Sequence, residues 1–262
     1  MKLSCSSWSF HRTFEQGKIS QLEWIEKCAK DLMLDGIELL GGHFPSTERA
    51  YLRALKKFTT DLGLTIACVS VSNNFGKDTE GKRKKEVEKV KQWVDIAYYL
   101  GAPVLRIFSG WPEGEKSQLW PEMINCLKES VEYAKEAGIV LGLENHNHHA
   151  FTTSVEDLLR ILKEVGSEWL KVTLDTGDYI VETGKLNGYP AIERVVNLAV
   201  FVHAKLYELD QKGADYKQDY DKIFDILNRA HYRGFVSVEY EGKEDELLAV
   251  PRGVKFLKKY IK

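Results

Sequence analysis

Residues 139–144 read IVLGLE, a short apolar run that ends in an acidic side chain. Three later runs have a similar form, because each is apolar and carries a potential metal ligand at or near its end: LKVTLD at 170–175, VFVHA at 200–204 and FVSVE at 235–239. The four runs begin at 139, 170, 200 and 235, which matches the length of a strand followed by a helix. This repeat predicts a (β/α)₈ barrel, that is, an α/β fold of the TIM-barrel type.

The same kind of run occurs eight times along the chain. The runs are short and rich in β-branched residues, as expected for parallel strands that are covered on both faces. We expect strands at 3–8, 36–40, 64–70, 103–108, 139–144, 170–175, 200–204 and 235–240. Between them, 87–100 and 122–137 have apolar residues at a spacing of three or four, which predicts helices. No Pro- or Ser-rich linker interrupts the pattern, so we expect one domain over 1–262.

Local signals give the expected helix boundaries. Ser20 with Glu23, and Thr153 with Glu156, have the spacing of capping boxes, which satisfy free backbone N–H groups at a helix start. The basic stretch 82–85 is followed by acidic residues, which is typical of a solvated helix face.

Composition limits the class of protein. The chain has 262 residues, a length typical of one α/β barrel. Its net charge of −2 does not favour a nucleic-acid binder, which usually has a basic excess. The four cysteines form no C-x-x-C pair, so we expect buried thiols. The start MKLSCSSWSF enters a strand directly, and no apolar run is long enough for a membrane span. We therefore expect a cytoplasmic protein without a membrane partner.

Four strand-end residues are the candidate metal ligands: Glu144, Asp175, His203 and Glu239. They end four consecutive strands, and the carboxyl ends of barrel strands converge on one mouth. A lone acidic residue at a strand end is often a cap or an ion-pair partner, but four in succession are harder to explain in that way. Three carboxylates and one imidazole suit a divalent cation that prefers oxygen.

The motifs LGLENH (141–146), VTLDTGD (172–178), VHAKLYELD (202–210) and GFVSVEYEG (234–242) resemble those of the xylose-isomerase-like barrel superfamily. The resemblance covers the chain from SSWSF to the last helix. This superfamily includes sugar isomerases, ketose 3-epimerases, inosose dehydratase, hydroxypyruvate isomerase and endonuclease-IV-type repair enzymes.

The resemblance implies a carbohydrate substrate and one cation held by the four ligands, with Mn²⁺ first and Mg²⁺, Co²⁺ or Zn²⁺ as alternatives. It also implies that Glu144 and Glu239 act as acid and base on opposite faces of a ketose. A carboxylate can remove a proton next to a metal-bound carbonyl and so form an enediolate. Return of the proton gives epimerisation or isomerisation, whereas loss of a β-hydroxyl gives dehydration. We expect an isomerase or epimerase. A lyase or dehydratase acting on an inosose or 3-keto-glycoside, and a non-catalytic sugar-binding barrel, are the alternatives.

Further residues are expected around the substrate. His146 follows Glu144 at the same-side spacing of an extended strand and is expected to orient substrate oxygens or protonate a leaving hydroxyl. Asp178 departs from the family pattern, because several relatives have a histidine three residues after the sixth-strand aspartate. Its carboxylate would accept hydrogen bonds from a sugar. Lys205 is expected to neutralise an enediolate, with an ion pair to Glu239 or Glu241 as the alternative.

Four more residues complete the expected pocket. Arg106 and Glu38 lie on predicted strands, where burial demands a partner. For Arg106 the alternative to a pocket role is an ion pair with Glu38 or Glu144. Trp8 and Trp111 lie near the ends of the first and fourth predicted strands, where flat rings suit sugar C–H surfaces; core packing is the alternative for Trp8. Glu241 competes with Glu239 as the last ligand, and we choose Glu239 because it is closer to the strand.

Other activities fit the sequence less well. A repair nuclease needs more histidine ligands, and the third-strand segment IACVSVSNNF contains none. An amidohydrolase needs a His-x-His pair, which the first strand SCSSWS lacks. No glycine-rich phosphate loop follows the last two strands, so an unphosphorylated sugar is favoured. Because dimers and tetramers are common among similar proteins, we also expect a homo-oligomer.

Overall fold

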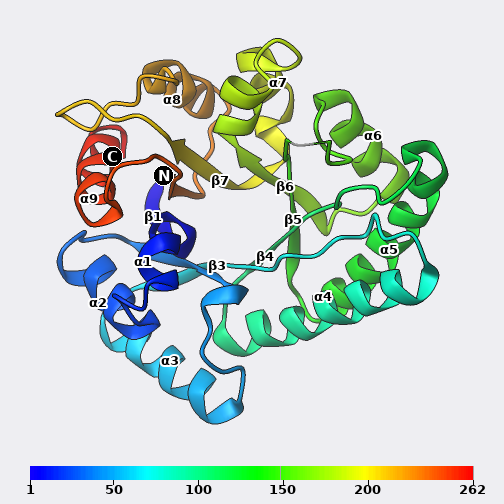
Figure 1. Ribbon diagram of the computed structural model, residues 1–262, viewed down its shortest axis with the longest axis horizontal. Helices are drawn as coiled ribbons and strands as arrows, with labels where there is room; N and C mark the ends of the chain where they lie inside the picture. Colours follow the sequence, from blue (N-terminus) through cyan, green and yellow to red (C-terminus); the bar gives the residue numbers. More distant parts are fainter. Residues whose placement is uncertain (148, 262) are drawn as a thin grey trace.

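The computed structural model describes residues 1–147 and 149–261. Eight parallel strands close into a barrel in the order of the sequence, and helices surround them (Figure 1). This confirms the predicted (β/α)₈ fold. The strands are β1 (Lys2–Ser6), β2 (Gly36–Leu40), β3 (Thr65–Ser70), β4 (Val104–Ile107), β5 (Val140–Glu144), β6 (Leu170–Asp175), β7 (Ala199–Leu206) and β8 (Phe235–Tyr240).

Helices α1 to α8 lie between successive strands in the sequence, α9 follows β8, and the helices surround the barrel (Figure 1). They are α1 (His11–Glu15), α2 (Gln21–Lys30), α3 (Arg49–Asp61), α4 (Glu80–Leu100), α5 (Lys116–Glu136), α6 (Val155–Val165), α7 (Gly188–Val195), α8 (Tyr220–Arg229) and α9 (Glu246–Leu257). Single turns extend several loops: η1 (Ser7–Phe10), η2 (Gly41–His43), η3 (Asp178–Glu182), η4 (Val196–Leu198) and η5 (Lys258–Tyr260).

Two strand ends differ from the sequence prediction by two residues, and every other strand boundary agrees within one residue. The first strand ends at Ser6, because the Ser6 hydroxyl accepts a hydrogen bond from the Trp8 N–H and starts η1. Trp8 therefore lies in a turn above the barrel and not in the strand. The seventh strand continues to Leu206, two residues beyond its predicted end, because 205 and 206 pair with β8.

One predicted capping box is confirmed and the other is wrong. Ser20 accepts from the Glu23 N–H, and the Glu23 carboxylate accepts from the Ser20 N–H. For α6 the cap is Ser154, whose hydroxyl accepts from the Asp157 N–H. The Thr153 hydroxyl instead donates to the Ala150 carbonyl in the preceding turn.

The core lies between the barrel and its helices, with a smaller apolar cluster inside the barrel. All four cysteines are buried free thiols, as expected: Cys5, Cys28, Cys68 and Cys126. The predicted basic helix face is mostly solvated, although Arg83 turns inward and pairs with Glu122 on α5. Among the described residues, every helix is too short or too polar to cross a bilayer.

Candidate metal centre

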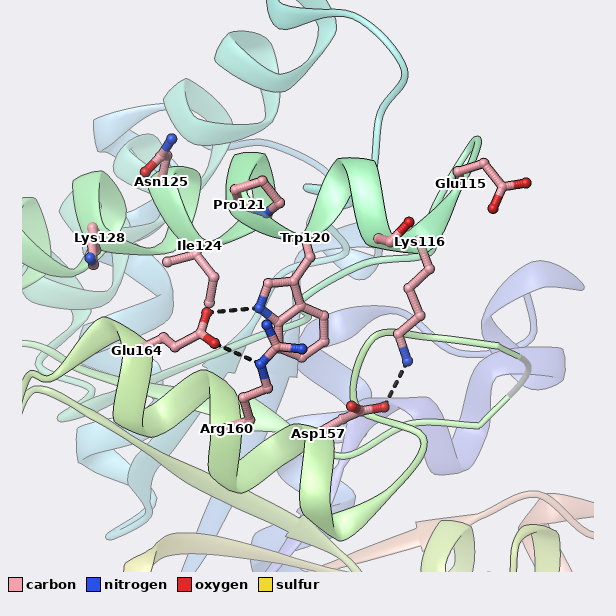
Figure 2. A pocket seen from close by; sticks show the side chains of 11 residues that line it. Glu115, Lys116, Trp120, Pro121, Ile124, Asn125, Lys128, Asp157, Arg160 and Glu164 are labelled. Carbon is pink, nitrogen blue, oxygen red and sulfur yellow. Dashed lines mark hydrogen bonds and ion pairs between the residues drawn. The ribbon is translucent and has the colours of Figure 1, made fainter.

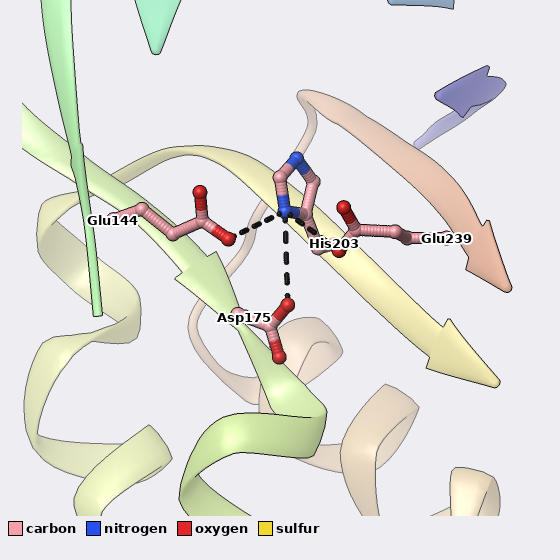
Figure 3. Close-up of side chains that lie close together, drawn as sticks. All are labelled: Glu144, Asp175, His203 and Glu239. Atoms are coloured by element: carbon pink, nitrogen blue, oxygen red, sulfur yellow. Dashed lines mark hydrogen bonds and ion pairs between the residues drawn. The ribbon is translucent and has the colours of Figure 1, made fainter. Parts of the chain in front are cut away.

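Four ligand-type side chains meet at the carboxyl ends of β5 to β8. Glu144 ends β5 and Asp175 ends β6, and His203 on β7 lies opposite Asp175 in the sheet register. Glu239 lies one residue before the end of β8. Because parallel barrel strands open their carboxyl ends at one mouth, these residues come together from four strands. The structure therefore gathers all four predicted ligands (Figure 3).

The His203 imidazole lies among the three carboxylates (Figure 3). Its Nδ1 is 3.1 Å from Glu144 Oε1, 3.2 Å from Glu239 Oε2 and 3.7 Å from Asp175 Oδ2. One ligand atom of each residue lies within 4.8 Å of the others. Around an octahedral cation with bonds of about 2.1 Å, adjacent ligand atoms are about 3.0 Å apart and opposite ones about 4.2 Å apart. The four side chains are thus close to the spacing of one such cation, and small side-chain movements would bring the widest pair into range.

Burial makes a cation the natural partner of this cluster. Asp175 and His203 have no exposed surface, and Glu144 and Glu239 are 2% and 4% exposed. Within the described part of the chain, Asp175 Oδ2 and Glu239 Oε2 accept no hydrogen bond, although both lie near the Lys205 ammonium. One imidazole N–H cannot satisfy three carboxylates, and buried carboxylates need a counter-charge. The donor set therefore fits a divalent cation that prefers oxygen.

Glu38 contacts His203 Nε2, the ring nitrogen that faces away from the other three carboxylates. Its Oε1 lies 3.0 Å from His203 Nε2, and both residues are fully buried. The hydroxyls of Ser70 and Ser237 also donate to Glu38. A carboxylate that accepts the Nε2–H leaves the Nδ1 lone pair directed at the cluster, the arrangement found behind most metal-binding histidines. Glu38 thus lies beneath the centre, enclosed by its three donors.

Arg106 pairs with Glu144, one of the two alternatives that the sequence leaves open. Its Nε is 3.0 Å from Glu144 Oε2, and its Nη1 donates to the Val71 carbonyl at 3.2 Å. Burial alone would raise the pKa of Glu144, but the Arg106 and His203 charges outweigh burial and lower that pKa. Glu144 is therefore ionised at neutral pH, as both a ligand and a base must be.

The Lys205 ammonium lies between three carboxylates, two of which belong to candidate ligands. Its Nζ is 3.1 Å from both Asp175 Oδ2 and Glu239 Oε2, and 3.3 Å from Glu241 Oε1. Burial would lower the pKa of Lys205, but these carboxylates raise it well above its usual value. In the same way, His203 and Lys205 overcome burial and hold the pKa of Glu239 well below its usual range. The ion pairs with Glu239 and Glu241, which the sequence analysis gave as the alternative role of Lys205, are both present.

His146 and Asp178 face each other beside the centre. His146 Nδ1 lies 3.7 Å from Asp178 Oδ2, and the Asp178 N–H donates to Asp175 Oδ1 at 2.9 Å. The His146 ring packs edge-on against Phe108 and Trp111, with centroids 5.0 and 5.2 Å away. The residue that departs from the family pattern therefore has a specific partner, and the predicted Trp111 forms part of the same wall.

Trp8 and Glu241 lie on the opposite side of the mouth. Trp8 stacks on His11 with centroids 4.4 Å apart, and its Nε1 donates to Glu241 Oε1 at 2.8 Å. The Glu241 side chain is 33% exposed and lies next to Lys205. The structure thus brings Glu239, and not Glu241, into the ligand cluster.

Tyr207 is a candidate site residue that the sequence analysis missed. It follows His203 and Lys205 at the two-residue spacing that places strand side chains on one side, so alternation was the available signal. Its hydroxyl is covered from solvent and has no hydrogen-bond partner among the described residues. The sequence analysis did not consider Tyr207, because the seventh strand was expected to end at 204 and the alternation was not followed beyond Lys205.

A groove of about 950 Å³ lies outside the barrel, between α5 and α6 (Figure 2). Its polar groups bond to one another, since Trp120 Nε1 donates to Glu164 at 2.8 Å and Lys116 Nζ to Asp157 at 2.7 Å. None of the candidate site residues lines it: the lining consists of Glu115, Lys116, Ser117, Trp120, Pro121, Ile124, Asn125, Lys128, Asp157, Arg160 and Glu164. The candidate chemistry therefore lies at the barrel mouth.

The chain is similar to an uncharacterised protein of Methanocaldococcus jannaschii, with 26% identity over 199 residues. The match covers 70% of this chain and 64% of the relative, so the chain spans just under two thirds of that protein's length.

Two solved structures share the fold. D-psicose 3-epimerase from Clostridium cellulolyticum H10 matches with a TM-score of 0.82 and 18% identity, covering 100% of this chain and 99% of that one. The probable 3-DHS dehydratase of Bacillus anthracis matches with a TM-score of 0.79 and 19% identity, covering 98% and 99%. A family model described as a xylose isomerase-like TIM barrel matches residues 27–260. On this match, the chain belongs to the xylose isomerase-like TIM barrel family.

Proposed function

We propose that this chain is a divalent-metal-dependent isomerase or epimerase of a ketose, with Mn²⁺ as the preferred cation. The cluster of Glu144, Asp175, His203 and Glu239 around one shared position carries the proposal. The similarity in fold to D-psicose 3-epimerase supports the choice of a ketose as substrate. When bound, the cation supplies Lewis-acid stabilisation of the negative charge that develops on the carbonyl oxygen.

Glu144 and Glu239 are the proposed proton-transfer groups. They approach His203 from opposite sides of the cluster, from β5 and β8 (Figure 3). One ionised carboxylate removes the proton next to the carbonyl. The other carboxylate takes up a proton from water and delivers it to the far face, and the first releases its proton afterwards. Return to the same carbon inverts it, and return to the neighbouring carbon isomerises the sugar. The Lys205 ammonium, 3.1 Å from Glu239, neutralises charge that develops nearby.

The test is solvent-deuterium incorporation into ketoses by Mn²⁺-loaded protein, with the bound metal measured in the same samples. Wild type is expected to exchange one C–H next to the carbonyl, and EDTA is expected to stop the exchange. Glu144→Gln and Glu239→Gln should both abolish exchange, and their metal content separates a lost ligand from a lost base. Glu164→Gln, in the outer groove, is the control and should exchange normally. If metal-loaded wild type exchanges no proton in any ketose, the proposal fails.

A lyase or dehydratase acting on an inosose or 3-keto-glycoside is the second candidate, and the His146–Asp178 pair favours it. This pair lies beside the same centre, with its two closest atoms 3.7 Å apart. A histidine oriented by a carboxylate is a suitable donor of a proton to a leaving hydroxyl. The fold shared with a probable 3-DHS dehydratase adds support. Product analysis separates the two candidates, because only the second releases water or an aglycone.

A further inference from the structure

The Tyr207 hydroxyl is a polar group that the proposed proton transfer does not use. Buried phenol hydroxyls usually have a hydrogen-bond partner. Tyr207 Oη has none within residues 1–147 and 149–261, although it is covered from solvent. Asp175 Oδ2 and Glu239 Oε2 share this condition. All three oxygens therefore lack a hydrogen bond within the described residues, although the two carboxylate oxygens form ion pairs with Lys205.

The surrounding backbone fixes Tyr207 in place. The N–H groups of Tyr207 and Glu208 both donate to the Asp215 carboxylate. The Tyr207 carbonyl lies against Gly242, where an added Cβ would come within 2.0 Å of the carbonyl oxygen. The neighbouring Glu241 N–H donates to the Leu206 carbonyl at 2.8 Å. The orphan hydroxyl therefore belongs to an anchored residue.

Gly177, in the DTGD segment, makes room for this side chain. A Cβ added at Gly177 would lie 2.6 Å from Tyr207 Oη and 2.6 Å from Lys205 Cγ, too close for either atom. Only glycine at position 177 leaves room for the side chains of both Lys205 and Tyr207 over this loop. The loop that carries Asp178 and the strand end that carries Lys205 and Tyr207 therefore fit together as one surface.

The polar neighbours of Tyr207 belong to the metal centre. The charged groups that act on the phenol most strongly are Asp175, Lys205 and Asp178. Burial, together with the Asp175 charge, raises the pKa of Tyr207 well above its usual value, so the hydroxyl keeps its proton. Along a strand, successive same-side residues are about 6.6 Å apart. Tyr207, one residue past the end of β7, thus lies one same-side position beyond Lys205, toward the mouth formed by the carboxyl ends of the strands.

We propose that Tyr207 donates a hydrogen bond to an oxygen on the part of the sugar farthest from its reacting carbons. This inference rests on the proposed function. Tyr207 is then a specificity-determining residue. It favours ketoses that carry a hydroxyl at this distal position over their deoxy analogues. The geometry of Gly177 and the lack of any internal partner for Oη support this assignment.

Tyr207→Phe removes only the hydroxyl and leaves the ring in place. D-Psicose and D-tagatose are the probes, each compared with its 5-deoxy and 6-deoxy analogues. Loss of one neutral hydrogen bond should lower kcat/KM about tenfold on a parent ketose. One of the deoxy analogues should be turned over at nearly the same rate by wild type and variant, because it lacks the hydroxyl that Tyr207 binds. Mn²⁺ affinity should be unchanged.

Tyr179→Phe is the matched control. Tyr179 Oη is also buried and without a partner among the described residues. The charged group that acts on it most strongly is Glu156 on α6, followed by Asp178 and then by Arg194 on α7. This variant should keep the wild-type preference among all sugars.

Three results would overturn the assignment. The first is wild-type kcat/KM in Tyr207→Phe for every sugar. The second is an equal loss on the parent ketoses and all deoxy analogues, which indicates a structural role such as bonding to a buried water. The third is wild type that acts on none of the ketoses, in which case the proposed function fails and the assignment fails with it. In the first two cases wild type remains active, so only the role of Tyr207 is lost.

Discussion

Replacing Glu38 with glutamine tests whether the residue behind His203 sets the affinity for the cation. Glu38 is fully buried and accepts from three donors: Ser70, Ser237 and His203 Nε2. Glutamine has nearly the same volume, but one oxygen becomes an NH₂ group. The serine hydroxyls can rotate and accept from that group, whereas an imidazole N–H cannot.

The expected loss follows from this mismatch. If the amide donates to Nε2, the ring proton moves to Nδ1, where it opposes a cation. If the amide oxygen accepts from Nε2, a charged acceptor has been replaced by a neutral one. Hydrogen bonds to charged groups contribute about 1.5–3 kcal/mol, and loss of such a second-shell partner weakens metal binding roughly 10- to 100-fold. The latter range corresponds to about 1.4–2.7 kcal/mol, so the two estimates agree.

The measurement is the Mn²⁺ dissociation constant by titration calorimetry of metal-stripped protein at one pH. Glu246→Gln is a matched control, because Glu246 is also buried and accepts from several donors on Arg12 and Thr13, outside the cluster. The control should lower the melting temperature but keep wild-type Mn²⁺ affinity. A dissociation constant for Glu38→Gln within twofold of wild type would refute the reasoning. An equal loss of affinity in Glu246→Gln would do the same.

Three further predictions concern charge and capping. Lys205→Met removes the counter-charge of Asp175 and Glu239, so metal-free protein should lose about 3–5 kcal/mol of stability; Mn²⁺ should raise its melting temperature more than that of wild type, and an equal rise argues against this role. Burial lowers the pKa of His43 from 6.5 to about 4. Between these values only the unfolded chain binds the proton, so the free energy of unfolding should fall as pH falls through this window; urea titrations of His43→Gln should show a flatter profile, and an unchanged one contradicts the assignment. Ser154→Ala should cost about 1 kcal/mol as the loss of an N-cap, and no change in urea unfolding would place the cap elsewhere.

The fold was predictable because each strand has its own local signal in the sequence. A barrel strand is buried on both faces, so it appears as an apolar run of the right length. The errors lie where a single side chain decides a boundary. Ser6 ends β1 by capping η1, and Ser154, not its neighbour Thr153, starts α6. Adjacent hydroxyl residues have nearly the same capping preference, so the sequence does not distinguish them.

The convergence of the four candidate ligands was predictable from strand ends, and the Arg106–Glu144 and Lys205–Glu239 pairs were among the alternatives considered, but the contacts of Glu38 were not predicted. Glu38 touches Ser70, Ser237 and His203, which come from three other strands. These contacts depend on how the strands are staggered when the barrel closes, and the register shifts between Ile37 and Glu38. An ion pair with a glutamate was the alternative considered for Lys205, but its contact with Asp175 depends on the β6–β7 register, which is also irregular.

The ligand cluster fixes where the proposed chemistry occurs, and its surroundings decide which reaction follows. Two carboxylates on opposite sides of one cation serve epimerisation, isomerisation and elimination equally well. Two features lie beside them, namely the His146–Asp178 pair and the Gly177 gap that admits Tyr207. If His146→Gln leaves ketose exchange intact but stops release of water from a keto-substrate, the pair determines elimination. If both reactions persist in that variant, the pair serves only to hold the wall formed with Phe108 and Trp111.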